Sequence, residues 1–196
     1  MGARSFLRGL VYFIESAGAT LIRRGGGAEL TLTENFGLHS GKQAYSRAYG
    51  ERSHAAGAFD SDGDAQHGAW HARGETSDDT PTVLTLDGIA AAAGSGTKFV
   101  PATGEIFYIR AKVCAGDHGT SKAIVTEIKW AVTNFGGTLV QLGATNTSFS
   151  VATAATTWTV APYVANDIIS ITVTGAVGAQ VRWSAEFQYC VVGKSG

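Results

Sequence analysis

Val181-Arg182-Trp183-Ser184-Ala185-Glu186-Phe187-Gln188-Tyr189-Cys190-Val191 is the stretch with the strictest alternation in the chain. Its odd-numbered side chains are apolar, and most of the even-numbered side chains between them are polar. Successive side chains of a β-strand point to opposite faces of a sheet. The pattern therefore predicts a strand with one face in a core and the other face in solvent.

Other segments with this pattern precede it and are separated by turn residues. Gly104 to Cys114 alternates in the same way, and Ile124 to Leu142 predicts a hairpin around the loop Asn134-Phe135-Gly136-Gly137. Further predicted strands are Pro81 to Gly88, Thr147 to Ala152, Thr156 to Val160 and Asp167 to Thr174. About eight strands at this spacing predict an all-β fold, a jelly-roll-like β-sandwich.

Composition and charge limit the possible partners. Charged residues make up 16% of the chain, whereas an average globular protein has about 25%. A surface with so little charge is typical of a β-rich assembly protein or of one covered by partners. The formal net charge of -1 argues against nucleic acid, because binding to phosphates requires many Lys and Arg contacts.

No membrane insertion is expected from the apolar residues near the start of the chain. The segment Ser5 to Ile14 is interrupted by Arg8 and Gly9. It is also shorter than the about 20 residues that a helix needs to span a bilayer.

A small-residue pattern occurs twice, seven residues apart, as Ser46-Arg47-Ala48-Tyr49-Gly50 and Ser53-His54-Ala55-Ala56-Gly57. Small side chains at every second position suit a strand that packs closely against other backbones. Two short copies bury little by themselves, so we expect identical chains to complete the packing. The predicted oligomer interface consists of Ser46, Ala48, Gly50, Ser53, Ala55 and Gly57.

These patterns divide the chain into three segments. Residues 1-36 are predicted to be an N-terminal arm for attachment, in which Gly25-Gly26-Gly27 precedes the alternating run Glu29 to Thr33. Residues 37-63 are predicted to form a β neck that carries the repeat, and residues 64-196 the β-sandwich head.

Motifs for catalysis or metal binding are incomplete. The run Asp60-Ser61-Asp62-Gly63-Asp64 suggests a calcium loop, but Ala65 and His71 stand where that pattern requires Gly and Glu. The chain contains no Gly-x-Ser-x-Gly motif. We therefore expect no enzymatic activity, no catalytic residues, no metal and no cofactor. Whether an ion is bound on a symmetry axis of an oligomer stays an open question.

Trp70, together with His67 and His71, is the candidate for a ligand or interface contact. An exposed indole can stack on a sugar or a partner protein. The histidines are four residues apart, but Gly68 argues against the helix that this metal-binding spacing would need. Cys114 and Cys190 are interpreted as buried free thiols, or as a disulfide if their strands are neighbours.

Two groups of residues resemble known families. His54-Ala55-Ala56-Gly57 and the copy before it resemble the head repeats of trimeric autotransporter adhesins, which wind into β-rolls shared by three chains. Gly63-Asp64-Ala65-Gln66, the segment Thr76 to Gly88 and the Arg182-Trp183 strand resemble a module of tail fibres and other virion structural proteins of tailed bacteriophages. Together the resemblance covers residues 45 to 192.

The resemblance implies a homotrimeric fibre or spike of a bacteriophage virion. Residues 1-36 would attach to other virion proteins, and the heads would bind a glycan or a protein on the host surface. The alternative is a capsid decoration protein that stabilises the phage head, and a cellular adhesin head is a third reading. The resemblance leaves open the receptor and whether the protein lies on the tail or on the capsid.

Overall fold

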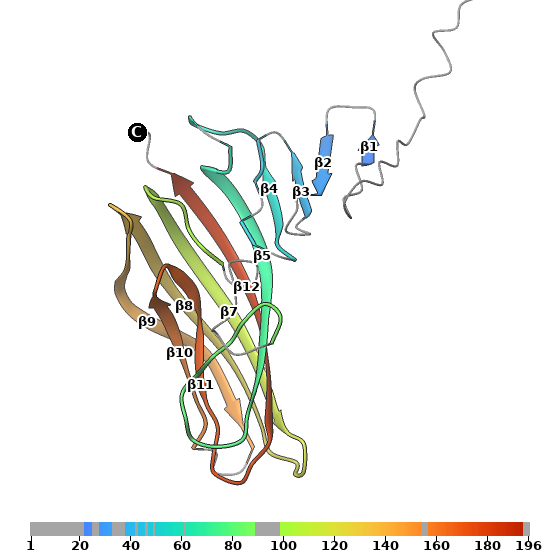
Figure 1. Cartoon of the computed structure of the whole chain (residues 1–196), viewed down its shortest axis with the longest axis vertical. Helices are drawn as coiled ribbons and strands as arrows, with labels where there is room; N and C mark the ends of the chain where they lie inside the picture. Colours follow the sequence, from blue (N-terminus) through green and yellow to red (C-terminus); the bar gives the residue numbers. More distant parts are fainter. Residues whose placement is uncertain are drawn as a thin grey trace, which may run out of the picture.

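Twelve β-strands in the described part of the chain form two sheets that face each other (Figure 1). The structure, a computed structural model, describes residues 22–24, 28–32, 38–41, 43–45, 47–48, 50–60, 62–88, 99–153 and 157–193. In chain order the strands are β1 (Ile22–Arg24), β2 (Ala28–Leu32), β3 (Leu38–Gly41), β4 (Arg52–Ala55), β5 (Ala65–Thr76), β6 (Thr82–Val83), β7 (Glu105–Asp117), β8 (Ala123–Phe135), β9 (Thr138–Ala152), β10 (Thr159–Ala165), β11 (Ile168–Thr174) and β12 (Val181–Gly193).

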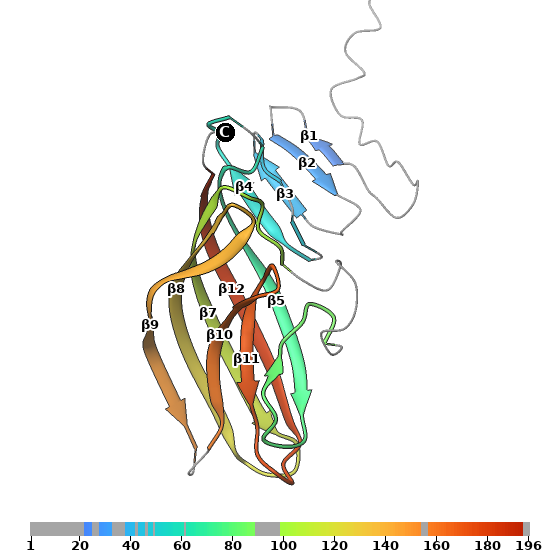
Figure 2. The same ribbon diagram turned by 60° about the vertical axis from the view of Figure 1, so that its left-hand side comes forward.

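The large sheet has the order β1-β2-β3-β4-β5-β12-β7-β8-β9, and the small sheet has the order β10-β11-β6. Neighbouring strands are antiparallel except for the parallel pair β3 and β4. The small sheet lies over one face of the large sheet, as the two views show (Figures 1 and 2). The prediction of an all-β sandwich is confirmed.

The core lies between the sheets and contains the apolar side chains that alternation assigned to one face. The odd-numbered residues of β12 from Val181 to Val191 are all buried. Phe107 and Ile109 of β7 lie beside them in the same sheet, and Ile171 and Val173 of β11 join the core from the small sheet. The inner faces that alternation predicts for β7 and β12 are therefore correct.

The β8 and β9 hairpin turns at Gly136 and Gly137, both of which have positive φ. The predicted hairpin is confirmed, but β9 continues without a break from Thr138 to Ala152. Its register against β8 shifts in the middle, near Gly143, whose φ is 70°. This irregularity separates the two segments that the sequence pattern assigned to different strands.

The long strand β5 is absent from the predicted strands. Its sequence Ala-Gln-His-Gly-Ala-Trp-His-Ala-Arg-Gly-Glu-Thr contains few of the β-branched residues that mark strands. Pairing with β12 along its whole length supplies the order that local preference lacks. Gly68 is required here, because an added Cβ would come within 2.6 Å of the Tyr189 ring. Of the predicted strand Pro81 to Gly88, only β6 and a bridge at Thr85 are formed.

The large sheet continues across the predicted boundaries at residues 36 and 63. β2 coincides with the predicted run Glu29 to Thr33 and pairs with β3. β3 pairs with β4, and β4 pairs with β5. The three segments are thus connected through one sheet, and their separate roles stay a prediction.

Half of the six repeat positions are buried by other residues of the same chain. Ala48, Ser53 and Ala55 are buried within the single chain, whereas Gly50 is exposed and Gly57 is half-buried. Ser46 lies outside the described residues. The packing that we expected from sister chains is therefore supplied, at three of these positions, by the chain's own strands.

A buried hydrogen-bond network holds this region on the end of the sandwich. Glu51 is 0% exposed and accepts the backbone N–H groups of Arg47 and Ala48 and the hydroxyl of Tyr189. Gln66 donates to the Tyr189 hydroxyl at 2.8 Å. The same amide exchanges two hydrogen bonds with the backbone of Tyr45. Glu51, Gln66 and Tyr189 thereby each gain partners, as burial demands.

Arg47 supplies a second connection from this region to the head. Its guanidinium pairs with Glu105 of β7 and donates to the carbonyl of Gly63 at 2.8 Å. The guanidinium carbon also lies 5.5 Å from the centre of the Phe107 ring. Burial alone would lower the pKa of Arg47, but the hydrogen bond and the charge of Glu105 outweigh it, so the pKa is raised.

Burial raises the pKa of the Glu51 carboxyl, although its hydrogen bonds from Tyr189 and Arg47 act in the opposite direction. Burial and the charge of Glu51 together raise the pKa of the Tyr189 hydroxyl. Both shifts follow from the cost of placing charge in a low-dielectric interior.

Replacing Glu51 by glutamine tests this network. Because the folded pKa of Glu51 is raised, its contribution to stability is present below the unfolded pKa of about 4.3 and is lost as pH rises through the folded pKa. In Glu51→Gln that loss is absent, so the free energy of unfolding should fall less with rising pH than in the wild type. Urea denaturation between about pH 4 and about pH 7 measures the difference.

Glu186→Gln is the matched control for this experiment, because Glu186 lies on the outer face of β12. Its pH dependence should follow the wild type. A Glu51→Gln variant with the same pH dependence as the wild type would show that the pKa of Glu51 is not raised by folding.

Candidate functional site

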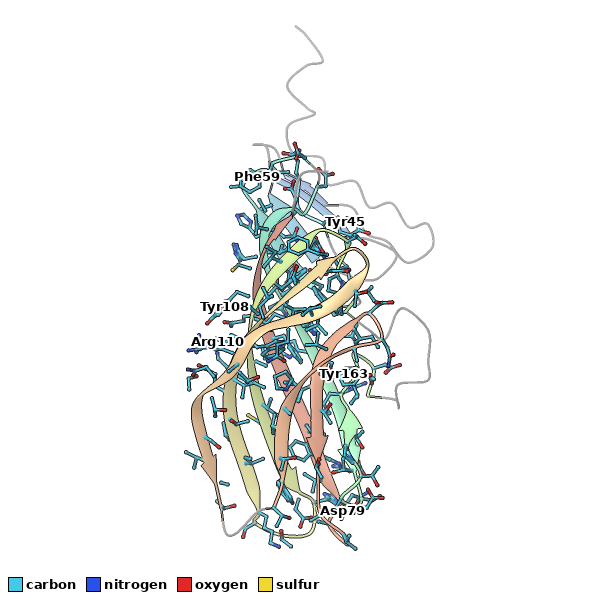
Figure 3. The ribbon with its side chains drawn as sticks, turned by 90° about the vertical axis from the view of Figure 1, so that its left-hand side faces the viewer. Tyr45, Phe59, Asp79, Tyr108, Arg110 and Tyr163 are labelled. Atoms are coloured by element: carbon cyan, nitrogen blue, oxygen red, sulfur yellow. The ribbon has the colours of Figure 1, made fainter. Side chains whose placement is uncertain are left out.

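The outer face of the large sheet, which points away from the small sheet, carries a hollow of about 690 Å³. The hollow lies over β4, β5, β12 and β7, with Ser40 of β3 at its border. Figure 3 shows the side chains of Tyr108 and Arg110 projecting outward from the sheet at this place. The hollow is the candidate functional site.

Two cross-strand rows of side chains form the hollow. The first row contains Ser40, His54, His67, Cys190 and Tyr108, and the second contains Arg52, Ala69, Gln188 and Arg110. The second row places the small side chain of Ala69 between its long outer members. Arg52 and Arg110 are three strands apart, which is about 14 Å at the usual strand spacing. Short side chains between long ones therefore produce the depression.

Two histidines meet at one border of the hollow. The ring centroids of His54 and His67 are 5.2 Å apart, and Nδ1 of His54 lies 3.1 Å from Oγ of Ser40. Of the predicted contact residues, His67 therefore lies in the site. His71 is exposed on the same face of β5, but it is opposite Glu186 and outside the lining of the hollow.

Trp70 is a core residue, which corrects its assignment as a ligand or interface contact. It points to the inner face of β5 and is 1% exposed. Its ring stacks on Phe99 at 4.0 Å and on Phe187 at 4.6 Å between centroids. A side chain covered in this way offers no surface to a ligand.

The cysteines are free thiols, as expected, but both are exposed on the outer face. β7 and β12 are neighbours, yet Cys190 is opposite Tyr108 and Cys114 is opposite Ser184. This register places the two cysteines six residues apart along the strands. The Cα atoms of a disulfide are at most about 7 Å apart, so the two cannot pair within one chain.

The cations of the hollow differ in their partners. Arg110 donates from Nε to Glu127 at 2.7 Å, and Glu127 also pairs with Lys129 at 3.3 Å. Arg52 forms no ion pair with any described residue. The residues that line the hollow include no carboxylate within the described part of the chain. The hollow therefore has an excess of positive charge.

Two acidic residues, Glu127 and Glu186, stand next to the hollow. Glu127 pairs with Arg110. Glu186 accepts a hydrogen bond from Gln188 at 3.3 Å. The hydroxyl of Ser148 donates to Glu127 at 2.6 Å. This hydrogen bond, followed by that of Arg110, lowers the pKa of Glu127 to about 2. The carboxylate thus remains charged at neutral pH and holds Arg110 in place.

The acidic run Asp60 to Asp64 forms a capped turn. The carboxylate of Asp64 accepts the backbone N–H groups of Phe59 at 2.8 Å and Asp60 at 2.7 Å. Within the described ranges, no three His, Cys, Asp or Glu side chains are grouped so that they could share a metal ion. The same residues include no helix long and apolar enough to cross a membrane.

Arg52, Tyr108 and Arg110 belong to no motif that the sequence displays. Alternation placed Tyr108 and Arg110 on the polar side of their strand, which is the only signal that the sequence contains. Which residues of other strands stand beside them depends on register, and the decisive strand β5 was not predicted. The site therefore becomes visible only when β4, β5, β12 and β7 are aligned.

The fold and the hollow define a β-sandwich protein with one open, hollowed sheet face. No protein family model matches the sequence, and no curated protein gives a significant match. Among solved structures, the tailspike protein of Acinetobacter baumannii phage AM24 is similar, with a TM-score of 0.43 and 9% sequence identity. The similarity covers 66% of this chain and 27% of that chain.

Ser148→Ala tests the electrostatics beside the hollow. Loss of the Ser148 hydrogen bond should raise the pKa of Glu127 from about 2 toward the ordinary glutamate value of about 4.3. The side-chain carboxyl resonance of Glu127, followed by NMR as a function of pH, gives this value directly. Ser184→Ala, on the outer face of β12, is the control and should leave the midpoint in place. An unchanged midpoint in Ser148→Ala would contradict the assigned cause.

Proposed function

We propose that the chain is a structural protein of a bacteriophage virion, a homotrimeric fibre or spike that presents β-sandwich heads to the host surface. The observation that carries the assembly part of this proposal is the long edge strand β9. It has fifteen residues, and no described strand pairs with its outer edge. Long exposed edges invite pairing with other chains, so proteins usually cover them.

Exposed apolar side chains stand on β9 and on the neighbouring strand β8, in two groups with Glu127 and Lys129 of β8 between them. Val140, Leu142 and Val151 of β9 are exposed, as are Val125 and Phe135 of β8. Val125 and Val151 stand directly opposite each other on the outer face. Scattered apolar residues are normal on a surface, but a group on one edge is typical of an interaction site. We refer to Phe135, Val140 and Leu142, which lie together near the turn of the hairpin, as the β8–β9 apolar patch.

Three copies are proposed because of the repeat's resemblance to the shared β-rolls of trimeric adhesins. Since Ala48, Ser53 and Ala55 are packed within the chain, their contribution to the interface would be indirect. Gly50 and Gly57 are accessible and could contact a sister chain. Three heads on one axis would raise the effective affinity of a weak contact by on the order of 10²–10⁴.

Solution mass tests the assembly. Analytical ultracentrifugation should show a species near three times 20.3 kDa. Leu142→Lys should shift this species toward the monomer, because a charge in an apolar interface is costly. Val177→Lys is the control: Val177 is exposed in the segment between β11 and β12, outside the β8–β9 apolar patch. A wild-type protein that is monomeric at every concentration would overturn the proposed trimer.

Deletion of residues 1-36 distinguishes the two proposed functions, a receptor-binding fibre and a capsid decoration protein. Deleting these residues should abolish adsorption of particles to the host if the chain is a receptor-binding fibre. The same deletion should instead reduce capsid binding and particle robustness if the chain is a decoration protein. A shorter deletion of residues 1-21 leaves every described strand intact and controls for folding. Deletions that change neither property would contradict both functions.

A further inference from the structure

We propose that the hollow on the outer face binds an acidic saccharide, a sugar ring that carries a carboxylate. The inference rests on residues of β4, β5, β7 and β12. It goes beyond the proposed function, because it would hold for an isolated head with no role in a virion.

The size and form of the hollow suit a small polar ligand. Its volume of about 690 Å³ lies within the range of about 300–1,000 Å³ found for small-molecule sites. The hollow is built on paired strands of the sheet and not on loops. Binding groups on such elements are held in position before the ligand arrives, which reduces the entropy cost of binding.

The positive charge of the hollow favours an anionic ligand. Arg52 and Arg110 stand at opposite ends of one row, and their side chains can reach toward a ligand above Ala69 and Gln188. Arg52 has no ion-pair partner among the described residues, so its guanidinium is available for a bidentate contact with a carboxylate. The pairing of Arg110 with Glu127 fixes the direction of the second guanidinium.

The other lining groups suit a sugar ring. Tyr108 is 49% exposed, and its ring offers a flat apolar surface on which the C–H face of a sugar can pack. Ala69 and Cys190 supply a small floor beside it. Gln188 and His54 add hydrogen-bonding groups for hydroxyls at the two sides. This combination of one apolar platform with several polar groups matches the two-sided character of a saccharide.

Nucleic acid is a poorer fit to the same hollow. A polyanion needs a row of cations along its backbone, because each neutralised phosphate adds to the affinity. Here two arginines flank a single depression, and the chain as a whole has a formal net charge of -1. A short saccharide with one or two carboxylates matches this charge better than a polyanion does.

The test is titration of the ¹⁵N-labelled full chain with digalacturonate, followed by NMR. Shifts should be confined to Arg52, His54, His67, Tyr108, Arg110 and Gln188 and their neighbours. Methyl galactoside, which has the ring without the carboxylate, should bind about tenfold more weakly or not at all. Acetate and inorganic sulfate, which have the charge without the ring, should behave in the same way.

Variants identify the groups responsible. Arg52→Ala should weaken digalacturonate binding by about tenfold or more, because a charge-assisted contact is lost. Tyr108→Ala should weaken it by about two- to tenfold through loss of the ring contact. Arg182→Ala is the matched control, since Arg182 lies on the outer face of β12 outside the hollow. It should bind like the wild type.

Several results would overturn the inference. If methyl galactoside bound as tightly as digalacturonate, the carboxylate would have no role in binding. If acetate or sulfate bound as tightly as digalacturonate, the sugar ring would have no role. Tighter binding of an oligoglutamate peptide would point to a protein partner instead. Absence of shifts in the hollow at millimolar digalacturonate would exclude the site. None of these results bears on the trimer, which the sedimentation experiment tests separately.

Discussion

The pairing of β12 with both β5 and β7 is the constraint on which the rest of the structure depends. β12 is matched to β5 from Val181 to Val192 and to β7 from Val181 to Gly193. Because side chains alternate along each strand, this one register determines which residues of three long strands enter the core and which stand together outside. A shift by one residue would move Phe187 and Tyr189 into solvent and would bring Glu186 and Gln188 into the core.

The same register makes the buried polar network possible. Tyr189 is directed inward by the alternation of β12, and its hydroxyl meets Gln66 of β5 and Glu51 just before β4. Burying a carboxyl and a guanidinium is costly unless each has hydrogen-bonding partners. Here Glu51 and Arg47 are both supplied with them, which ties the segment before β4 to one conformation. The network therefore specifies where the repeat region lies and does not merely add to stability.

The sequence predicted the inner side of the sandwich well and the outer side poorly. Inner residues such as Phe107, Ile171 and Trp183 are recognisable because alternation of apolar and polar residues is a local signal. β5 was missed because its glycines, alanines and histidines carry no local preference for a strand, and its order comes from β12. Trp70 was assigned to the surface for the same reason: without β5, nothing indicated that its ring faces Phe99 and Phe187.

The candidate site depends on information that no local pattern contains. Arg52 and Arg110 are far apart in the sequence, and they flank one hollow because two intervening strands place Ala69 and Gln188 between them. Close packing occurs next to the repeat, where Gly68 lies against the backbone of Arg52 and an added Cβ would be 2.6 Å from its carbonyl oxygen. The partner in that packing is β5 of the same chain.

The hollow and the β8–β9 apolar patch occupy the same face of the sheet, and their spacing decides whether both can function together. Tyr108 at the border of the hollow is opposite Ala131 of β8, which is opposite Leu142 of β9. Two strand spacings, about 10 Å, therefore separate the tyrosine from the apolar edge. A sister chain seated on β9 would leave the floor of the hollow open and would stand beside its Tyr108 wall. Assembly and ligand binding would then be compatible on one face of the sheet.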